Sequence, residues 1–245
     1  MAATASGLLE DGRVIFAGVG MPLVASAAAK RSHAPNLTVV LEGGIIGPEI
    51  APGRLPISTN DVRASRGAAM LTTITDIFLY AQRGYFDYGF LGAAQIDRYG
   101  NINTSVIGDR AKPTVRLPGT GGANDIASLC NEVLVVTQHE PRRFVEKVDF
   151  VTSPGHLTGD GSRQRAGLIS RGPTRVVTDL ALLDFDDSGH MRLRALQPGV
   201  TVADVAARTG FELPVHPEVY ELPPPGEEIL LALRELDPDG ETLGE

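Results

Sequence analysis

Apolar and polar positions alternate along the chain in blocks that have the lengths of strands and helices. Two short apolar runs, at residues 13–18 and 37–41, are typical of buried strands. The alanine-rich segment 22–31 between them has the composition of a helix, with a proline in its first turn. A strand, a helix and a second strand in this order predict a βαβ unit near the start of the chain.

The same alternation continues towards the C-terminus. It predicts an α/β fold in three layers, an open and mostly parallel sheet between helices. The chain contains no internal repeat, low-complexity block or long linker, so we expect residues 1–245 to form a single domain. We expect the prolines at 223–225 only to space the last helix from the body, and the tail from Asp237 onward to fray. The further predicted strands are residues 88–91, 133–137, 175–179, 182–185 and 191–195, and the further predicted helices are 74–83, 124–129, 202–209 and 227–236.

The composition argues against several classes of function. The chain has 245 residues, of which 42% are hydrophobic, and is long enough to bury its own core. Its net charge is −8 and its Lys and Arg residues are scattered, which argues against a nucleic-acid partner. No apolar run is long enough to span a membrane or resembles a signal peptide, so we predict a soluble protein of the cytoplasm. Trp is absent and aromatic residues make up 5%, so a base-stacking surface is not expected and small ligands remain open.

Residues that bind metals or act as common nucleophiles do not form a recognisable set. The single cysteine, Cys130, has no disulfide partner, and its apolar neighbourhood predicts a buried small hydrophobe rather than a nucleophile. No G-x-S-x-G motif is present, which argues against a serine hydrolase. We expect no metal, because the five histidines lack paired ligand spacing; they are His33, His139, His156, His190 and His216.

Glu42 stands at the end of the second predicted strand and is followed by Gly43 and Gly44. The glycines allow a sharp turn beneath the carboxylate. In an open parallel sheet, ligands bind beyond the carboxyl ends of the strands, so a glutamate at this edge faces the expected substrate site. The alternative is a solvated glutamate with no chemical role, which is the commoner situation at a strand end.

Two glycine-rich loops precede predicted helices. The loop at residues 18–23 imitates a dinucleotide-binding fingerprint, but Leu23 replaces its third glycine and Pro22 removes an N–H group, so we expect an ordinary βα turn. The loop at residues 117–124 exposes several backbone N–H groups before a helix. That geometry suits a phosphate, a carboxylate or the oxyanion of a thioester under attack, although glycine is also common in turns of purely structural role.

Three segments together resemble the β subunit of the glutaconate-type class I CoA-transferases. They are the strand-end Glu42-Gly43, a G-A-x-x-x-D-x-x-G-N-x-N motif at residues 92–103, and a G-x-G-G-x-x-D-I motif at residues 119–126. The resemblance extends from about residue 5 to about residue 235. It implies the CoA-transferase (NagB/RpiA-like) fold and a coenzyme A thioester as substrate, with no permanently bound cofactor.

The resemblance also implies roles for individual residues. Glu42 would be the nucleophile and would form a covalent glutamyl-CoA intermediate. The residue types themselves suggest further roles: Asn124 and Asp125 cap the helix after the second glycine loop, and Asp97 and Asn101 are structural. Gln95 and Asn103 are candidates for binding a substrate carboxylate or the pantetheine amide, and the alternative is that they satisfy the local backbone. The backbone of the two glycine turns would bind the oxyanion or CoA, through Gly43, Gly44, Gly119, Gly121, Gly122 and Ala123.

The family resemblance finally implies a partner and leaves alternatives. The partner is a homologous α subunit, in an α2β2 heterotetramer with the active site between the chains. Relatives that have replaced the glutamate are ring-opening hydrolases or decarboxylases of CoA thioesters; this chain keeps Glu42, which favours transfer. Leu41 precedes the glutamate where many relatives have Ser, and the pair Gly43-Gly44 follows it where they have a small polar residue, which leaves the specificity for the acid open. A non-catalytic, CoA-binding or structural subunit is the third alternative.

Overall fold

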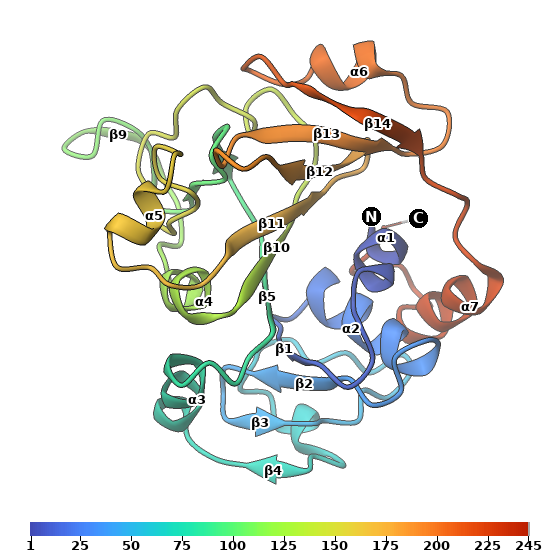
Figure 1. The fold of residues 1–245 in the computed structure, drawn as a ribbon. Helices are drawn as coiled ribbons and strands as arrows, with labels where there is room; N and C mark the ends of the chain where they lie inside the picture. Colours follow the sequence, from blue (N-terminus) through green and yellow to red (C-terminus); the bar gives the residue numbers. More distant parts are fainter. Residues whose placement is uncertain (245) are drawn as a thin grey trace. The chain divides into compact units, whose positions relative to one another are not determined.

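The computed structural model describes residues 1–244 and divides into two compact units. Unit 1 comprises Met1–Leu91 together with the C-terminal segment from Pro225, and unit 2 comprises Gly92–Pro224. Figure 1 shows the strands and helices of each unit. The predicted α/β fold, an open and mostly parallel sheet with helices on both sides, is confirmed. That the whole chain forms a single domain stays a prediction.

The strands of unit 1 form around a βαβ unit. β1 (Val14–Phe16) pairs in parallel with β2 (Thr38–Leu41), and α2 (Met21–Arg31) connects them, as predicted. β5 (Tyr88–Leu91) pairs in parallel with the other side of β1. Beyond β2, two antiparallel strands that the sequence did not predict close this edge of the sheet: β3 (Ile45–Ile46) and β4 (Met70–Leu71). They have only two residues each, too few to show a period.

Three helices of unit 1 pack through small side chains. α1 (Ala2–Gly7), α2 and α7 (Glu227–Leu236) share a buried cluster that includes Ala28 and Leu233. Alanine lets helix backbones approach closely, which explains the alanine-rich sequence of α2. After α7, the Asp237 carboxylate accepts hydrogen bonds from the N–H groups of residues 242 and 243, so this part of the tail is tied back rather than frayed.

Two further helices follow β3 in unit 1. The 3₁₀ helix at Val62–Ser65 was not predicted. α3 (Ile74–Gln82) was predicted at residues 74–83, and its start is determined by a capping box between Thr73 and Asp76. The 3₁₀ helix lies in the connection from β3 to β4, and α3 lies in the connection from β4 to β5.

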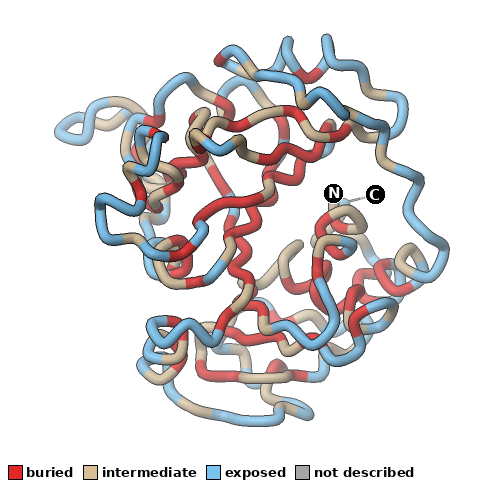
Figure 2. Tube along the Cα trace, viewed as in Figure 1, coloured by how far each residue is buried: buried red, intermediate tan, exposed pale blue. Residues whose placement is uncertain are grey.

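Unit 2 carries the remaining strands. β10 (Glu132–Val136) pairs in parallel with β11 (Gly172–Val177), and β11 continues antiparallel through β12 (Ala181–Phe185) to β13 (Met191–Leu196). All four strands were predicted within a few residues. β14 (Val215–Glu221) pairs in parallel with β13 and was missed, because proline at 217 is unusual in a strand. Figure 2 shows buried residues along β10 to β13, whereas β14 lies mostly exposed.

The helices and hairpins of unit 2 are short. α4 (Ala123–Leu129) matches its prediction closely, whereas α6 (Val202–Ala206) ends three residues before the predicted 209. The hairpins were not predicted, because their short strands lack the continuous apolar run that indicates a buried strand. They are β6 (Gln95–Ile96) with β7 (Ile102–Asn103) and β8 (Val106–Gly108) with β9 (Pro113–Arg116), and the remaining helix is α5 (Ser162–Arg165).

A histidine lies in the core of unit 2. The His139 ring is fully buried and stacks on Phe144, with ring centroids 4.0 Å apart. Its two nitrogens bond the hydroxyls of Thr178, at 3.1 Å, and Thr209, at 3.0 Å. Burial disfavours the charged ring and lowers the pKa of His139 to about 4. In the folded protein at neutral pH the His139 ring is therefore uncharged.

We predict that this histidine makes unit 2 less stable in mild acid. The unfolded chain protonates His139 near its ordinary pKa of 6.5, whereas the folded chain does so only near 4. The stabilisation is complete above pH 6.5 and is lost as the pH falls towards 4, by roughly 3 kcal/mol. Urea unfolding followed by circular dichroism at several pH values measures it. In His139→Gln the free energy of unfolding should depend less on pH between pH 4 and 6.5 than in the wild type. If His139→Gln and the exposed-site control His33→Gln show the same pH dependence, the effect does not come from His139.

Candidate active site

Glu42 directly follows β2, at the turn into β3 in unit 1. Its side chain is half-buried. Within residues 1–244 its carboxylate has no hydrogen bond and no ion pair. An unengaged carboxylate at a strand end keeps its lone pairs for an incoming electrophile. Glu42 therefore lies at the end of β2, as expected from the sequence, and its carboxylate forms no ion pair with a neighbour within residues 1–244.

The two glycines after Glu42 are required by the packing of the turn. A Cβ at Gly43 would overlap the Thr59 carbonyl oxygen and the Asn60 side-chain oxygen. A Cβ at Gly44 would overlap the Thr72 carbonyl oxygen, and its φ of +95° is in any case a glycine conformation. The turn is therefore held between segment 59–60 and segment 72–73, and this fixes the backbone beside Glu42.

The backbone donors of this turn are partly used. The Gly44 N–H donates to the Leu41 carbonyl at 3.1 Å and closes the turn, while the Gly44 carbonyl accepts from Thr72 N–H at 2.8 Å. The Gly43 N–H has no acceptor within the described residues 1–244. Of the two glycines predicted to bind an oxyanion, Gly44 thus serves mainly to build the turn, and the binding role of both stays a prediction.

The second glycine loop lies in unit 2, before α4. Gly119 and Gly121 have φ values of +95° and +47°, and a Cβ added at either position would meet no other atom within 4 Å. Thr104 fixes the start of the loop, because its carbonyl accepts from the Gly119 N–H and its hydroxyl donates to the Gly119 carbonyl, both at 2.8 Å. The Ala123 N–H donates to the Thr120 carbonyl at 2.9 Å. In this described loop the unengaged N–H groups are those of Thr120, Gly121 and Gly122.

The predicted caps of α4 are wrong. The N-cap position is Gly122, which has no capping side chain, and the Thr120 hydroxyl accepts from the Asn124 N–H at 3.1 Å instead. The Asn124 side chain donates to the Thr152 carbonyl at 2.9 Å. Asn124 and Asp125 lie inside the first helical turn, where their side chains cannot take the N-cap position. Thr120 was missed because it precedes two glycines rather than the helix itself.

The two candidate substrate-binding amides are buried opposite each other in the β6–β7 hairpin. Asn103 Nδ2 donates to Gln95 Oε1 at 2.7 Å, and Gln95 Nε2 donates to Asp149 at 3.0 Å. Thr104 then links this hairpin to the Gly119 loop, so the structure brings these unit 2 candidates together. Because both amides are engaged within unit 2, they shape the hairpin, and their contact with substrate stays a prediction.

Asp97 and Asn101 are structural, as predicted. Both are buried, and Asp97 accepts hydrogen bonds from the Asn101 backbone and side chain at 3.0 Å. Asn101 in turn holds a following loop by accepting from the N–H groups of Gly155 and Leu157. Burial raises the pKa of Asp97. The aspartate and first asparagine of the G-A-x-x-x-D-x-x-G-N-x-N motif therefore organise the backbone.

The prediction that Cys130 is a buried small hydrophobe is confirmed. It is fully buried, and desolvation raises the pKa of its thiol to about 12, so it is not a nucleophile at neutral pH.

Among residues 1–244, no cluster of His, Cys, Asp or Glu is arranged to hold a metal ion. No helix in the same described range has the length and apolar character needed to cross a membrane.

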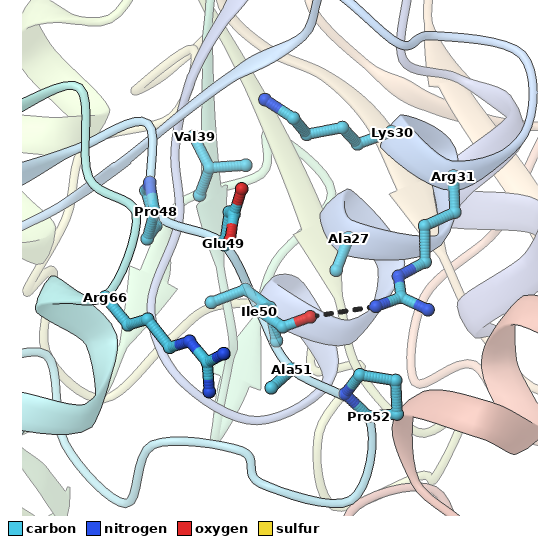
Figure 3. Close-up of a pocket in the computed structure, with 10 residues that line it drawn as sticks. All are labelled: Ala27, Lys30, Arg31, Val39, Pro48, Glu49, Ile50, Ala51, Pro52 and Arg66. Atoms are coloured by element: carbon cyan, nitrogen blue, oxygen red, sulfur yellow. Dashed lines mark hydrogen bonds between the residues drawn. The ribbon is translucent and has the colours of Figure 1, made fainter.

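Unit 1 also contains a pocket of about 420 Å³ that the sequence did not reveal. Its lining includes the basic side chains Lys30, Arg31 and Arg66, and Glu42 does not belong to it. Figure 3 shows Arg31 reaching from α2 to the Ile50 carbonyl, to which it donates at 3.0 Å. Lys30 donates to the Leu37 carbonyl at 3.2 Å, at the beginning of β2. The pocket thus lies towards the start of β2, whereas Glu42 follows its end.

Comparison with known proteins identifies the family. The family described as "Coenzyme A transferase" matches residues 1–208. The chain is also 41% identical over 239 residues to the B subunit of 3-oxoadipate CoA-transferase from Pseudomonas knackmussii, and the match covers 97% of this chain and 91% of the relative. The chain belongs to the coenzyme A transferase family.

A second relative supports both the sequence and the fold of this coenzyme A transferase. The B subunit of glutaconate CoA-transferase from Acidaminococcus fermentans is 38% identical over 245 residues, covering 97% of this chain and 91% of the relative. The crystal structure of glutaconate coenzyme A-transferase from that organism superposes with a TM-score of 0.92 and 35% identity, over 100% of this chain and 95% of the other. The predicted membership among class I CoA-transferase β subunits is confirmed.

Other members of the coenzyme A transferase family have different reactions in their names. The crystal structure of the decarboxylase AibA/AibB has a TM-score of 0.85 and 28% identity over 98% of this chain and 94% of the other. A cholesterol ring-cleaving hydrolase IpdB subunit of Mycobacterium tuberculosis is 36% identical over 124 residues, which cover 50% of this chain and 49% of that relative. The 3-oxoadipate and glutaconate transferases are more similar in sequence over the full chain, which favours transfer.

Proposed function

We propose that this chain is the catalytic β subunit of a heteromeric acyl-CoA:carboxylate CoA-transferase, with Glu42 as the nucleophile. The observation that carries the proposal is the Glu42 carboxylate, which has no partner within residues 1–244 and follows a strand on a turn that only glycines allow. Such a turn holds a nucleophile in one orientation before substrate arrives, which lowers the entropy cost of reaching the transition state.

The first half of the reaction loads CoA onto the protein. A Glu42 carboxylate oxygen attacks the thioester carbon of the donor, forming a C–O bond, and the C–S bond breaks to release CoA thiolate. The thiolate sulfur then attacks the Glu42 carbonyl of this mixed anhydride. A C–S bond forms, the anhydride C–O bond breaks, and the donor acid leaves as a carboxylate. Glu42 now carries a glutamyl-CoA thioester.

The second half repeats these steps with another acid. The acceptor carboxylate attacks the glutamyl thioester, which restores an anhydride and releases the thiolate. The thiolate attacks the acceptor's acyl carbon and regenerates the Glu42 carboxylate. Covalent storage of CoA between two acids gives ping-pong kinetics. Contacts to the remote parts of CoA are expected to offset the high energy of the anhydride.

The glycine turns and the partner subunit complete the proposed site. Gly43, Gly121 and Gly122 have N–H groups that remain without an acceptor in the described chain and are our candidates for binding the oxyanion or CoA. The two full-length relatives are B subunits by name, so we propose a homologous α subunit as partner, in an α2β2 heterotetramer. Size-exclusion chromatography with light scattering on the co-expressed chains measures the stoichiometry.

The names of the two relatives suggest the class of acid. Both 3-oxoadipate and glutaconate are short dicarboxylic acids, and the corresponding subunits match 97% of this chain. We therefore propose a short dicarboxylate as donor or acceptor. Steady-state exchange of CoA between matched mono- and dicarboxylic acids of equal chain length tests this class, and a preference for the monocarboxylic acids would contradict it.

The mechanism is tested by trapping the intermediate. The αβ complex is incubated with each acyl-CoA, with and without borohydride, which reduces a glutamyl thioester, and the mass of the β chain is measured. A mass change that maps to Glu42 in the wild type and is absent in Glu42→Gln supports transfer through glutamyl-CoA. Consumption of thioester without any adduct and without a second acid would instead indicate a hydrolase or decarboxylase. Unchanged turnover in Glu42→Ala would indicate a structural subunit.

A further inference from the structure

The backbone around Glu42 offers few hydrogen-bond donors. Attack at the Glu42 carbonyl places negative charge on its oxygen, and such an oxyanion needs donors already in position. The adjacent Gly44 N–H is bonded to Leu41 at 3.1 Å and is not available. At this turn the backbone N–H groups without an acceptor in the described chain are those of Glu42 and Gly43. A side chain beside this turn is a natural source of a further donor.

Asn60 is the side chain that lies there. Its Oδ1 is so close to Gly43 that a Cβ at this glycine would overlap it. Gly43 directly follows Glu42, and consecutive Cα atoms are about 3.8 Å apart. The Asn60 side-chain oxygen therefore lies against the residue that follows the nucleophile, although 18 positions separate Asn60 from Glu42 in the sequence.

The carboxamide of Asn60 is exposed and has no partner for its side-chain N–H groups within residues 1–244. Its backbone N–H is engaged, with the Ser58 hydroxyl at 3.3 Å. Because Oδ1 and Nδ2 are on opposite branches of a planar group, an oxygen turned to Gly43 leaves Nδ2 directed away from that glycine. The side chain thus presents two free N–H donors at the rim of the Glu42 turn.

The turn that carries Asn60 is held rigidly by its neighbour Asp61. The Asp61 carboxylate accepts from the backbone N–H groups of Ile57, at 3.1 Å, and Arg63, at 2.9 Å, and it pairs with the Arg63 guanidinium at 2.6 Å. The hydrogen bonds from Arg63 keep the pKa of Asp61 well below its usual range, so the carboxylate stays charged. A donor on a turn of this kind loses little entropy when it binds an oxyanion.

We propose that Asn60 is a catalytic residue that donates a side-chain hydrogen bond to the oxyanion formed at the Glu42 carbonyl. This rests on the proposed function, because it needs Glu42 to become an acyl group. The carboxamide takes no part in bond making; it stabilises negative charge as the thiolate attacks the anhydride and as the acceptor acid attacks the thioester. Its neighbours Ile57 and Val62, 83% and 82% exposed, leave the same turn open to a bound acyl group.

The test compares Asn60→Ala, Asn60→Asp and the control Thr59→Val in the αβ complex. Thr59 contacts Gly43 through its backbone oxygen, so the control keeps the packing of the turn. Asn60→Ala should lower kcat by roughly 10²-fold, with little change in the KM of the acid and in the melting temperature, because the donor acts in the transition state. Thr59→Val should stay within about twofold of the wild type, the scatter expected for a side chain outside the reaction.

Asn60→Asp provides a signature that a structural role would not produce. An ionised carboxylate repels the oxyanion, whereas a protonated one can donate, so activity relative to the wild type should recover as the pH falls. The rate of adduct formation at Glu42 is measured in the same samples. If the wild type forms the adduct and Asn60→Ala forms and discharges it at the wild-type rate, the role of Asn60 is overturned. If the wild type forms no adduct with any donor, the proposed function itself fails.

Discussion

Replacing Glu42 by glutamine is expected to lower kcat for CoA transfer by about 10⁴-fold or more, the size of effect seen when a covalent nucleophile is removed. Glutamine has nearly the same shape but carries no charge and cannot form the anhydride. The Glu42 carboxylate has no hydrogen bond or ion pair within residues 1–244, so the change should leave the melting temperature unaltered. Steady-state exchange of CoA between two acids, measured in the αβ complex, gives the rate.

Two further variants calibrate this result. Glu49→Gln removes an exposed carboxylate seven residues later and should leave kcat unchanged. Glu42→Asp keeps the charge but withdraws the oxygens by one methylene, and a displacement of about 1 Å is expected to cost about 10²-fold. Turnover of Glu42→Gln at a rate similar to Glu49→Gln would contradict the nucleophilic role and leave Glu42 as a solvated strand-end residue.

Replacing Arg163 by methionine is expected to destabilise the protein by about 3–5 kcal/mol. The Arg163 guanidinium is 1% exposed and has no carboxylate partner among residues 1–244. It donates instead to the carbonyls of Ser170 at 3.0 Å, Gly155 at 2.9 Å and Ala127 at 2.7 Å. Burial lowers its pKa to about 10, so it stays charged at neutral pH. Methionine would fill much of the volume but leave these buried acceptors without a donor.

A neighbouring arginine supplies the control for this prediction. Arg165 lies two residues later, is exposed, and donates to the Asp160 carbonyl at 2.7 Å. Arg165→Met should change the free energy of unfolding by less than about 0.5 kcal/mol, as exposed substitutions usually do. Urea unfolding of the three proteins measures the difference. Equal midpoints for Arg163→Met and Arg165→Met would show that the buried hydrogen bonds contribute nothing net.

Arg163 also supports the helix that follows the second glycine loop. The hydrogen bond from Arg163 to the Ala127 carbonyl holds the C-terminal turn of α4. The helix begins at Ala123, directly after Gly122. Ser170 supports the same turn by donating to the Ser128 carbonyl at 3.1 Å. The orientation of α4 within unit 2, and with it the start of the helix at the glycines, thus depends on a buried cation far along the chain.

Elements with a marked apolar pattern could be predicted from the sequence, and elements without one could not. The helix at 227–236 and the strand at 88–91 appear with the predicted bounds, because a sustained apolar period or an apolar run of strand length is enough to indicate them. The two-residue strand β3 forms by pairing with β2, and β4 forms by pairing with β3. Two residues have no period of their own, and β4 lies far along the chain from its partner β3, so no local pattern could show them.

The candidate site divides in the same way. Glu42 could be found because its signal is local: an apolar run, a carboxylate and two glycines in succession. Asn60, Arg163 and the mutual bond of Gln95 with Asn103 gave no such signal, since each depends on a contact with residues several positions or more away. A polar side chain looks the same in a sequence whether it awaits substrate or satisfies a neighbour.

The sequence by itself determined the α/β order of elements, the family, and the glutamate at the end of β2, because periodicity, glycine turns and motif spacing are properties of neighbouring residues. Only the tertiary structure decided which polar groups remain unengaged. It showed that the Gly44 and Ala123 donors are bonded within the chain, that the Gln95 and Asn103 amides face each other, and that the Asn60 carboxamide meets Gly43. Hydrogen bonds and close approaches join residues through space, and folding alone brings them within reach.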